Sequence, residues 1–359
     1  MRASRKRKHN EKRNAKNYLE KRLSDIAVSS YDRKRSHEDV QKLLNEMTEL
    51  LCDNSIFSRV FRKSGSCASS TKIKRADEFD YDLPIKSPDS YRVEIVEDQN
   101  HTAINARVFS GDNQLTPSMI QQRLYNFMLV GASSLDSCYQ MSSQRRREFE
   151  WRRCRISVDG ELHGPAVTMR MSIPNFHDIS VDISPSLKTN EVTLRDYRWP
   201  RDKTRQVLQA EVIEEIQSVG LHVVPKGKDL WKFSVSRAER VLMSRIDHDN
   251  GCRKKCHKLL KSDFDEWNKR YNLDGISTFL FKHELFWLNE DKKQDWSQNQ
   301  LDKRYCEMLQ DLSNRIREGK ILNYFRSTEN LLKGKYPSVL NQLADLATAR
   351  RNELIGMDQ

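Results

Sequence analysis

The hydrophobic pattern of the chain changes its period between residues 190 and 200, and this change limits the folds that the chain can adopt. Residues 67–85 and 150–187 contain short β-branched and alternating stretches, such as Arg155–Val158, which predict strands of one mixed sheet. After Pro200 the apolar residues recur at helical spacing instead. The pattern predicts an α+β protein in which a sheet-bearing lobe precedes a helical lobe.

Two apolar stripes in the second part of the chain stop at a glycine, as helices commonly do. One stripe ends at Gly220 and the other at Gly319; they consist of Val207, Leu208, Val212, Ile213 and Ile216, and of Tyr305, Met308, Leu309, Leu312 and Ile316. We therefore expect three segments: a basic arm over residues 1–30, a sheet-bearing core over 31–195 and a helical lobe over 196–359.

One long amphipathic helix is expected before the first strand. Ser36–Asp39 has the pattern of a capping box, and apolar residues follow at helical spacing up to about Asn54. We expect this helix to pack along the sheet-bearing lobe as a spine.

The formal net charge of +12 favours an anionic partner. Residues 1–24 hold ten Lys or Arg against two acidic residues, which is two thirds of that excess. Because phosphate backbones reward Lys and Arg through counterion release, a nucleic acid is the leading partner, ahead of an anionic membrane surface. The arm itself fits a solvated tail or a nuclear-import segment as well as an arm that wraps nucleic acid.

The sequence also indicates a compartment. No apolar run approaches the roughly 18 residues of a membrane span, and the N-terminus is polar and basic. The 7 cysteines are odd in number and mostly scattered, which does not suit a disulfide framework. We expect a cytoplasmic protein and leave a nuclear location open.

Two carboxylates sit side by side on a predicted strand. In Glu78-Phe79-Asp80 the first and third side chains share one face, while Phe79 turns into the core. Adjacent carboxylates repel unless a cation lies between them, and Mg²⁺ is the natural cation, with Mn²⁺ left open. A Glu-x-Asp pair alone also occurs on many exposed strands, but Gly65-Ser66, thirteen residues upstream of Glu78, would present backbone N–H groups and a hydroxyl to a triphosphate.

A third acid, Asp182, interrupts the apolar strand pattern of residues 179–183. A lone carboxylate buried in a sheet is costly, so it needs an ionic or functional partner. Three carboxylates would hold two Mg²⁺ ions about 3.5–4 Å apart, one at an attacking hydroxyl and one at a leaving pyrophosphate.

At these residues the sequence resembles the cyclic GMP-AMP synthase and cyclic GMP-AMP synthase-like receptor family of metazoan nucleotidyltransferases. The resemblance covers nearly everything from about Ser36 onward, with the same order and spacing. The segments that carry it are Gly65-Ser66, Glu78–Asp80, Gly164–Thr168, Ile179–Ile183, Trp231–Ser236, Cys252–Lys261 and Ser277–Lys282.

The resemblance implies a bilobed nucleotidyltransferase fold, with the spine helix and catalytic sheet in the core and a helical C-terminal lobe. It implies that Glu78, Asp80 and Asp182 form the metal-binding catalytic triad. Nucleotide contacts are implied for Gly65, Ser66, Lys232, Ser234, Lys261, Thr278 and Phe279, with Phe279 stacking on a base. From the residues alone, Lys261 also fits a solvated helix face and Phe279 a core position.

The implied reaction joins ATP and GTP into a cyclic dinucleotide, such as cyclic GMP-AMP, that signals through a STING-type receptor in innate antiviral immunity. Lys232 stands where an arginine is common in the vertebrate enzymes, and the two side chains are not interchangeable at a stacked or forked contact. The nucleotide pair and the phosphodiester linkage therefore stay open.

The vertebrate zinc-binding thumb is nearly absent from this sequence. His248, Cys252, Cys256 and His257 remain, but their spacing is unusual for zinc and zinc binding is not expected. In this respect the chain is similar to the invertebrate receptors, several of which sense double-stranded RNA.

A nucleic-acid surface is expected if the spine helix and the helix after residue 252 lie on the same side. It comprises Arg33, Lys34, Arg35, Arg253, Lys254, Lys255 and Lys258. Double-stranded RNA is favoured and DNA left open, because duplex RNA is bound through phosphates and shape without a base-reading motif. Arg145–Arg147 and Arg152-Arg153 fit either an added basic surface or a solvated loop.

Two other functions stay open: a non-catalytic binding protein of the male-abnormal (Mab) type, whose members often lose the triad, and a terminal nucleotidyltransferase that extends an RNA end. The complete triad argues against the first. A homodimer is also left open.

Overall fold

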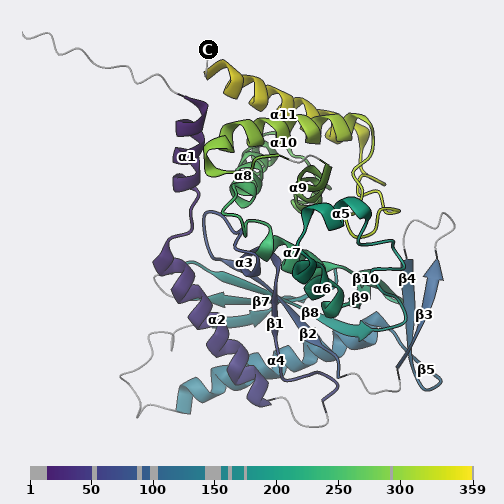
Figure 1. Cartoon of the computed structure of the whole chain (residues 1–359). Coiled ribbons are helices and arrows are strands. Elements are labelled where there is room, and N and C mark those ends of the chain that lie inside the picture. Colours follow the sequence, from purple (N-terminus) through teal and green to yellow (C-terminus); the bar gives the residue numbers. More distant parts are fainter. Residues whose placement is uncertain are drawn as a thin grey trace, which may run out of the picture. The chain divides into compact units, whose positions relative to one another are not determined.

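The structure, a computed structural model, describes residues 14–50, 55–86, 91–97, 104–141, 155–160, 164–173, 176–291 and 294–357. The chain forms two compact units (Figure 1). The sheet unit comprises Ala27–Asp247 and Leu322–Asn330, and the helical unit comprises Met1–Ile26, His248–Ile321 and Leu331–Gln359.

The boundary between the units lies at residues 247–248. The boundary expected at residues 195–196 falls inside the sheet unit instead. The reason is a pair of strands, β9 (Leu221–Lys226) and β10 (Leu230–Ser234), that follow the first helical stripe and extend the sheet.

The sheet is mixed, which together with the helices confirms the predicted α+β class. Its main path runs β1-β2-β8-β9-β10-β4-β3, while β5 pairs with β4, β7 with β8, and β6 with β7. The other strands are β1 (Arg62–Ser64), β2 (Glu78–Pro84), β3 (Tyr91–Glu97), β4 (Ile104–Ser110), β5 (Asn113–Leu115), β6 (Arg155–Val158), β7 (Val167–Ser172) and β8 (Ile179–Thr189). β2 and β8 are parallel neighbours, so the two acid-bearing strands of the sequence lie side by side.

The spine helix starts earlier than predicted. α2 covers Ser30–Leu50, and the hydroxyl of Ser29 accepts a hydrogen bond from the backbone N–H of Asp32 at 2.9 Å, as an N-cap does. The predicted capping box at Ser36 is therefore wrong, since Ser36 lies inside the helix and is fully buried. The predicted end near Asn54 lies outside the described residues, whereas the stripe Val40, Leu43, Leu44 and Met47 is buried as expected.

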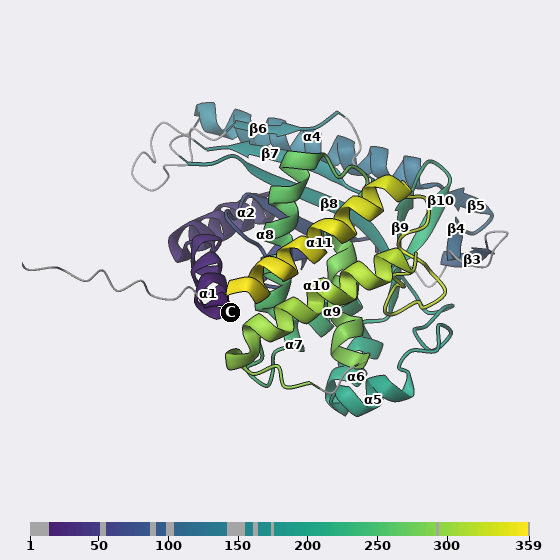
Figure 2. The ribbon, with the colours of Figure 1, turned by 90° about the horizontal axis from the view of Figure 1, so that it is seen from above.

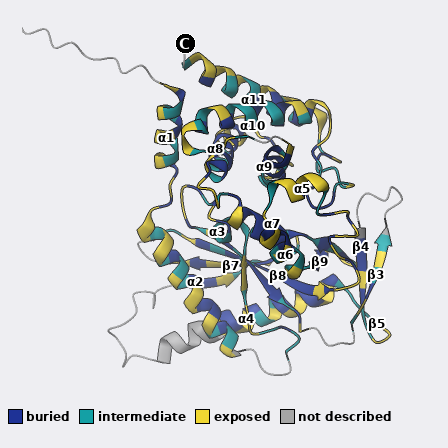
Figure 3. Ribbon diagram, viewed as in Figure 1, coloured by how far each residue is buried: buried dark blue, intermediate teal, exposed yellow. Residues whose placement is uncertain are grey.

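Further helices of the sheet unit are α3 (Gly65–Ala68), α4 (Pro117–Met141), α5 (Asp202–Val207), α6 (Ala210–Val219) and α7 (Ser236–Arg245). The strands β7, β8 and β9 are largely buried (Figure 3). Phe79, Val181 and Trp231 are each at most 1% exposed and anchor this core. A sheet with a buried core thus carries the acidic side chains.

The helical unit consists of α1 (Ala15–Asp25), α8 (Arg253–Tyr271), α9 (Phe279–Asp291), a short 3₁₀ helix η2 (Gln298–Gln300), α10 (Leu301–Arg317) and α11 (Pro337–Met357). α10 and α11 pack against each other along their lengths (Figure 2). The predicted stripe Tyr305, Met308, Leu309, Leu312 and Ile316 is buried. No helix in the described ranges is long and apolar enough to cross a membrane.

Part of the predicted basic arm is a packed helix. Ala15 and Leu19 of α1 are buried, and Arg22 pairs with Asp263 of α8 at 2.7 Å. Arg350 of α11 and the hydroxyl of Tyr305 contact the same carboxylate at 3.1 and 2.6 Å. Residues 14–25 are therefore not a solvated tail, and residues 1–13 lie outside the described part.

Candidate metal and nucleotide site

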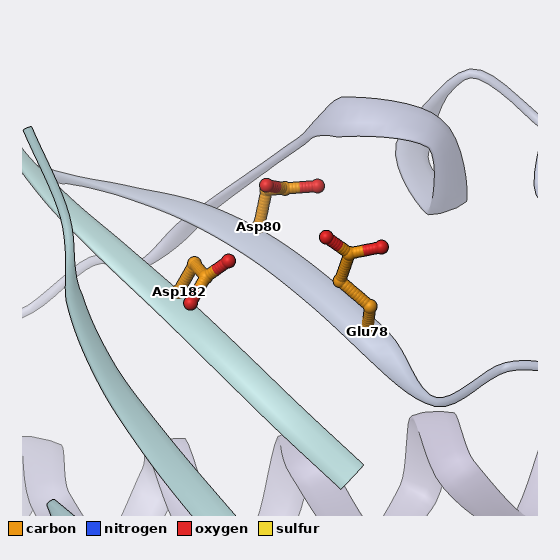
Figure 4. Close-up of side chains that lie close together, drawn as sticks. All are labelled: Glu78, Asp80 and Asp182. Carbon is orange, nitrogen blue, oxygen red and sulfur yellow. The ribbon is translucent and has the colours of Figure 1, made fainter. Parts of the chain in front are cut away.

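Three carboxylates converge on the sheet. Asp80 of β2 is directly opposite Asp182 of β8 in the parallel register, and Glu78 precedes Asp80 by two residues on the same face. One oxygen from each of the three side chains lies within 4.8 Å of the others (Figure 4). Between the acids, Phe79 is 1% exposed and fixes which way the strand faces. The sequence-based grouping of Glu78, Asp80 and Asp182 is therefore a real juxtaposition.

The donor set suits a hard divalent cation. All three side chains offer carboxylate oxygens, Glu78 is exposed, and Asp80 and Asp182 are half-buried, so a cation and a phosphate can reach them. Three mutually repelling carboxylates favour a bound cation, and oxygen ligands of this kind favour Mg²⁺ or Mn²⁺. The residues present thus fit the metal that the family implies.

Thr168 holds one of these three carboxylates in place. It lies on β7 directly opposite Asp182, and its hydroxyl donates a hydrogen bond of 2.6 Å to Asp182 Oδ1. Thr168 is 2% exposed, so water does not compete strongly for this bond. Sequence analysis did not single out Thr168, because its role depends on strand register, which the pattern of β7 does not specify.

Gly65 is required by its contact with Asp80. Its φ is +64°, and a Cβ built on it would lie 1.7 Å from Asp80 Oδ2. Any side chain at position 65 would therefore displace the Asp80 carboxylate. The turn itself is the short helix α3, closed by a hydrogen bond of 2.9 Å from Thr71 N to Ser66 O. The predicted Gly65-Ser66 turn thus lies against the acids.

Lys72 contacts the acids from the segment that follows this turn. Its Nζ lies 2.8 Å from Glu78 Oε2 and 3.2 Å from Asp77 Oδ1. Burial disfavours the charged ammonium, but the hydrogen bond and attraction to Glu78 and Asp77 outweigh it and raise the pKa of Lys72. Sequence reasoning missed Lys72, whose only signal was a basic residue six positions before Glu78.

The face of the sheet that carries the acids continues to β10. Leu187 of β8 and Phe233 of β10 both pair with Val223 of β9, so these three share one face. Asp182 lies on the opposite face, because it is an odd number of residues from Leu187. Lys232 and Ser234, the neighbours of Phe233 on β10, therefore lie on the same face of the sheet as Asp182.

Lys232 has an acidic neighbour that the sequence did not reveal. Its Nζ lies 3.6 Å from Glu329 Oε1, in the returning segment that belongs to the sheet unit. Asn323 and Arg326 also donate to Glu329. Burial disfavours the carboxylate, but Arg326 and Lys232 outweigh it and lower the pKa of Glu329. The side chain of Lys232 is thus directed by an ionised carboxylate.

The other predicted nucleotide residues belong to the helical unit. Lys261 lies on α8, Thr278 immediately precedes α9, and Phe279 is its first residue; all three are half-buried. The Phe279 ring is in edge contact with the His283 ring, with centroids 4.4 Å apart, and lies 5.5 Å from Lys282 Nζ. Phe279 is therefore a partly accessible aromatic residue and not a core one.

The predicted nucleic-acid residues fall on α2 and α8, one helix in each unit. Arg33, Lys34 and Lys255 are exposed, while Lys254 and Lys258 are half-buried. Arg35, also half-buried, lies over the Phe176 ring at 4.5 Å. Arg145–Arg147 and Arg152-Arg153 lie outside the described residues.

Arg253 does not belong to an exposed stripe. It is 8% exposed, and its guanidinium donates to Asn289 Oδ1 at 2.6 Å and Asp249 Oδ1 at 2.7 Å. It also stacks over the Trp296 ring at 5.1 Å. The first residue of α8 points inward, so the prediction of Arg253 as a surface contact is wrong.

The four residues considered for zinc are divided between surface and interior. Cys252, Cys256 and His257 are buried, whereas His248 is exposed. Within the described ranges, the group of three or more side chains that is arranged to hold a metal is Glu78, Asp80 and Asp182.

Comparison with known proteins agrees with this architecture. The chain matches the Mab-21 protein nucleotidyltransferase domain over residues 68–245 and the Mab-21 protein HhH/H2TH-like domain over residues 252–348. The gap between the two matches contains the structural boundary at residues 247–248. The fold and site thus define a nucleotidyltransferase-type protein with a helical C-terminal domain. The chain belongs to the Mab-21 family, which confirms the family predicted from its sequence.

Relatives within this family carry two kinds of name. Protein mab-21-like 3 of Danio rerio is 29% identical over 170 residues, which cover 46% of this chain and 43% of that protein. Cyclic GMP-AMP synthase-like receptors of Magallana gigas and Trichogramma pretiosum are 24% and 21% identical over 82% and 93% of this chain. The matched regions cover 51% and 70% of those receptors, so the chain spans about half or less of the Danio rerio and Magallana gigas proteins.

Proposed function

We propose that this protein is a metal-dependent nucleotidyltransferase that joins two nucleoside triphosphates, ATP and GTP in the first instance, into a cyclic dinucleotide. The observation that carries the proposal is the complete set of Glu78, Asp80 and Asp182 on adjacent parallel strands. A divalent cation bound there would supply charge neutralisation at the α-phosphate and lower the pKa of an attacking hydroxyl.

The chain's own residues prepare this reaction. In each step a ribose hydroxyl oxygen forms a bond to an α-phosphorus, the bond from that phosphorus to the β-phosphate oxygen breaks, and pyrophosphate and one proton leave. Thr168 keeps Asp182 oriented, and the turn at Gly65 and Ser66 offers backbone N–H groups and a hydroxyl to the triphosphate beside Asp80. Lys232 and Ser234 lie on the same sheet face and suit contacts to a nucleoside.

The proposed activator is duplex nucleic acid, with double-stranded RNA favoured. The support is the exposed Arg33 and Lys34 on α2, the exposed Lys255 and half-buried Lys254 and Lys258 on α8, and the names of the two receptor relatives. A phosphate backbone suits such residues without base-specific contacts. The product would act on a STING-type receptor.

The name of the Danio rerio relative supports a second candidate, a non-catalytic Mab-21 protein that binds nucleotide or nucleic acid. Incubation with all four nucleoside triphosphates, Mg²⁺ or Mn²⁺ and a panel of RNA and DNA duplexes, followed by mass identification of products, tests both. We expect a cyclic dinucleotide from the wild-type protein and none from Asp182→Asn. An extended RNA end would indicate a terminal nucleotidyltransferase, and nucleotide binding without any product would favour the non-catalytic protein.

Charge reversal tests the activator surface. Lys254→Glu with Lys255→Glu should abolish stimulation by duplexes, while stimulation at the wild-type level would refute this assignment.

A further inference from the structure

The backbone segment that carries Lys72 is held in place beside the proposed metal ligands. Thr71, the residue before it, is 2% exposed, and its hydroxyl shares a hydrogen bond of 2.9 Å with the hydroxyl of Ser69. Ile73, the residue after it, is 7% exposed. Together with the bond from Thr71 N to Ser66 O, these contacts hold the segment in place. The position of the Lys72 ammonium beside Glu78 is therefore fixed by the packed backbone segment that carries it.

The contact joins the ammonium to a carboxylate that the metal also needs. Lys72 Nζ is 2.8 Å from Glu78 Oε2, and the side chain of Lys72 is 15% exposed against 54% for Glu78. Asp77, at 3.2 Å, gives the ammonium a second carboxylate outside the metal-ligand group. Lys72 thus has an alternative partner when Glu78 is engaged elsewhere.

The Lys72 ammonium and a divalent cation would compete for the carboxylate of Glu78. A positive charge at hydrogen-bonding distance stabilises the ionised carboxylate and disfavours a second cation beside it. A divalent cation attracts the three acids more strongly than one ammonium does, so it prevails once its concentration is sufficient. Asp77 then retains Lys72 next to the site.

We propose that Lys72 is a positioning residue that holds Glu78 in the metal-free protein and is exchanged for the divalent cation, passing to Asp77. This rests on the proposed metal-dependent function. The consequence is that Lys72 sets the metal concentration at which the site fills, and that its removal tightens metal binding while weakening the metal-free fold.

The test titrates the full chain with Mn²⁺. Electron paramagnetic resonance measures how much of the Mn²⁺ is bound. Lys72→Met should lower the Mn²⁺ dissociation constant about tenfold, since one cation is removed from contact with a ligand. Lys72→Arg keeps the charge and should stay near wild type. Arg75→Met removes a charge from the same segment, at an exposed residue, and should also stay near wild type.

Thermal unfolding separates this role from a merely structural one. Metal-free Lys72→Met should melt below the wild-type protein, yet gain more in melting temperature than wild type when Mn²⁺ is added. If Lys72→Met binds Mn²⁺ as wild type does, or more weakly, the exchange is refuted. If the wild-type protein binds no Mn²⁺, or binds Mn²⁺ only as tightly as Asp182→Asn does, the proposed metal-dependent function fails instead. The failure of the exchange and the failure of the proposed function are therefore distinguishable.

Discussion

Replacement of Gly65 by alanine should separate metal binding from folding. The added Cβ would meet Asp80 Oδ2 at 1.7 Å, Cγ at 2.5 Å and Cβ at 2.9 Å, so the Asp80 side chain must move. The positive φ of +64° adds strain of about 1–2 kcal/mol for a residue with a Cβ. Together with the overlap, we expect the free energy of unfolding to fall by about 2–4 kcal/mol.

Gly65→Ala should also weaken metal binding in the protein that remains folded. Disturbing the position of a metal ligand typically costs a factor of about 10–100 in metal affinity. The Mn²⁺ dissociation constant should rise by that factor, measured by electron paramagnetic resonance in protein that circular dichroism shows to be folded.

Gly111→Ala is the matched control. Gly111 has a φ of +58°, but a Cβ there would meet nothing within 4 Å. It should lose about 1 kcal/mol in urea unfolding from strain alone and bind Mn²⁺ as wild type does. Wild-type Mn²⁺ binding by folded Gly65→Ala would refute the argument that this glycine exists to admit Asp80.

Two further predictions concern single buried contacts. Thr168→Val removes the hydrogen bond to Asp182 and should weaken Mn²⁺ binding about tenfold or more, with Thr168→Ser close to wild type; equal binding by all three proteins would contradict a positioning role. Glu284 is fully buried, and burial, followed by the nearby carboxylate of Asp311, raises its pKa well above the usual 4.5, although Arg315 lies 3.5 Å away. The folded state therefore holds a proton that the unfolded state releases, so stability should fall as pH rises from about 4.5 toward the raised pKa. Glu284→Gln should flatten that decline in urea unfolding measured from pH 5 to 8, and an unchanged slope would contradict it.

The sequence predicted the parts of the fold that a single periodic segment determines. The buried stripe of α2 and the inward turn of Phe79 follow from side-chain periods of 3.6 and 2, so they needed no tertiary information. The predicted start of α2 at Ser36 was wrong, because the helix begins at Ser30, where the hydroxyl of Ser29 accepts a hydrogen bond from the backbone N–H of Asp32.

The division of the chain was harder to predict, since it depends on contacts between distant segments. β9 and β10 follow a helical stripe in the sequence, yet they pair with β8 and with each other and so belong to the sheet. Leu322–Asn330 returns to the sheet unit from within the helical half and places Glu329 beside Lys232. Neither connection leaves a local signal, because strand order and chain return are decided by the whole sheet.

The candidate site shows the same limit at the level of single residues. The acids were predictable because carboxylates that interrupt a strand pattern are costly to bury and hence conspicuous, and because the segments around them resemble a known nucleotidyltransferase family. The groups that control them were not: Thr168 acts through the antiparallel register of β7 with β8, and Lys72 through the folded path of the segment between α3 and β2. An ordinary threonine on a strand and an ordinary lysine in a loop acquire their roles only from those positions. The sequence therefore predicts the ligands of such a site more readily than the residues that control them. Ligands are recognised by residue type, whereas controlling residues are recognised only by their position in the fold.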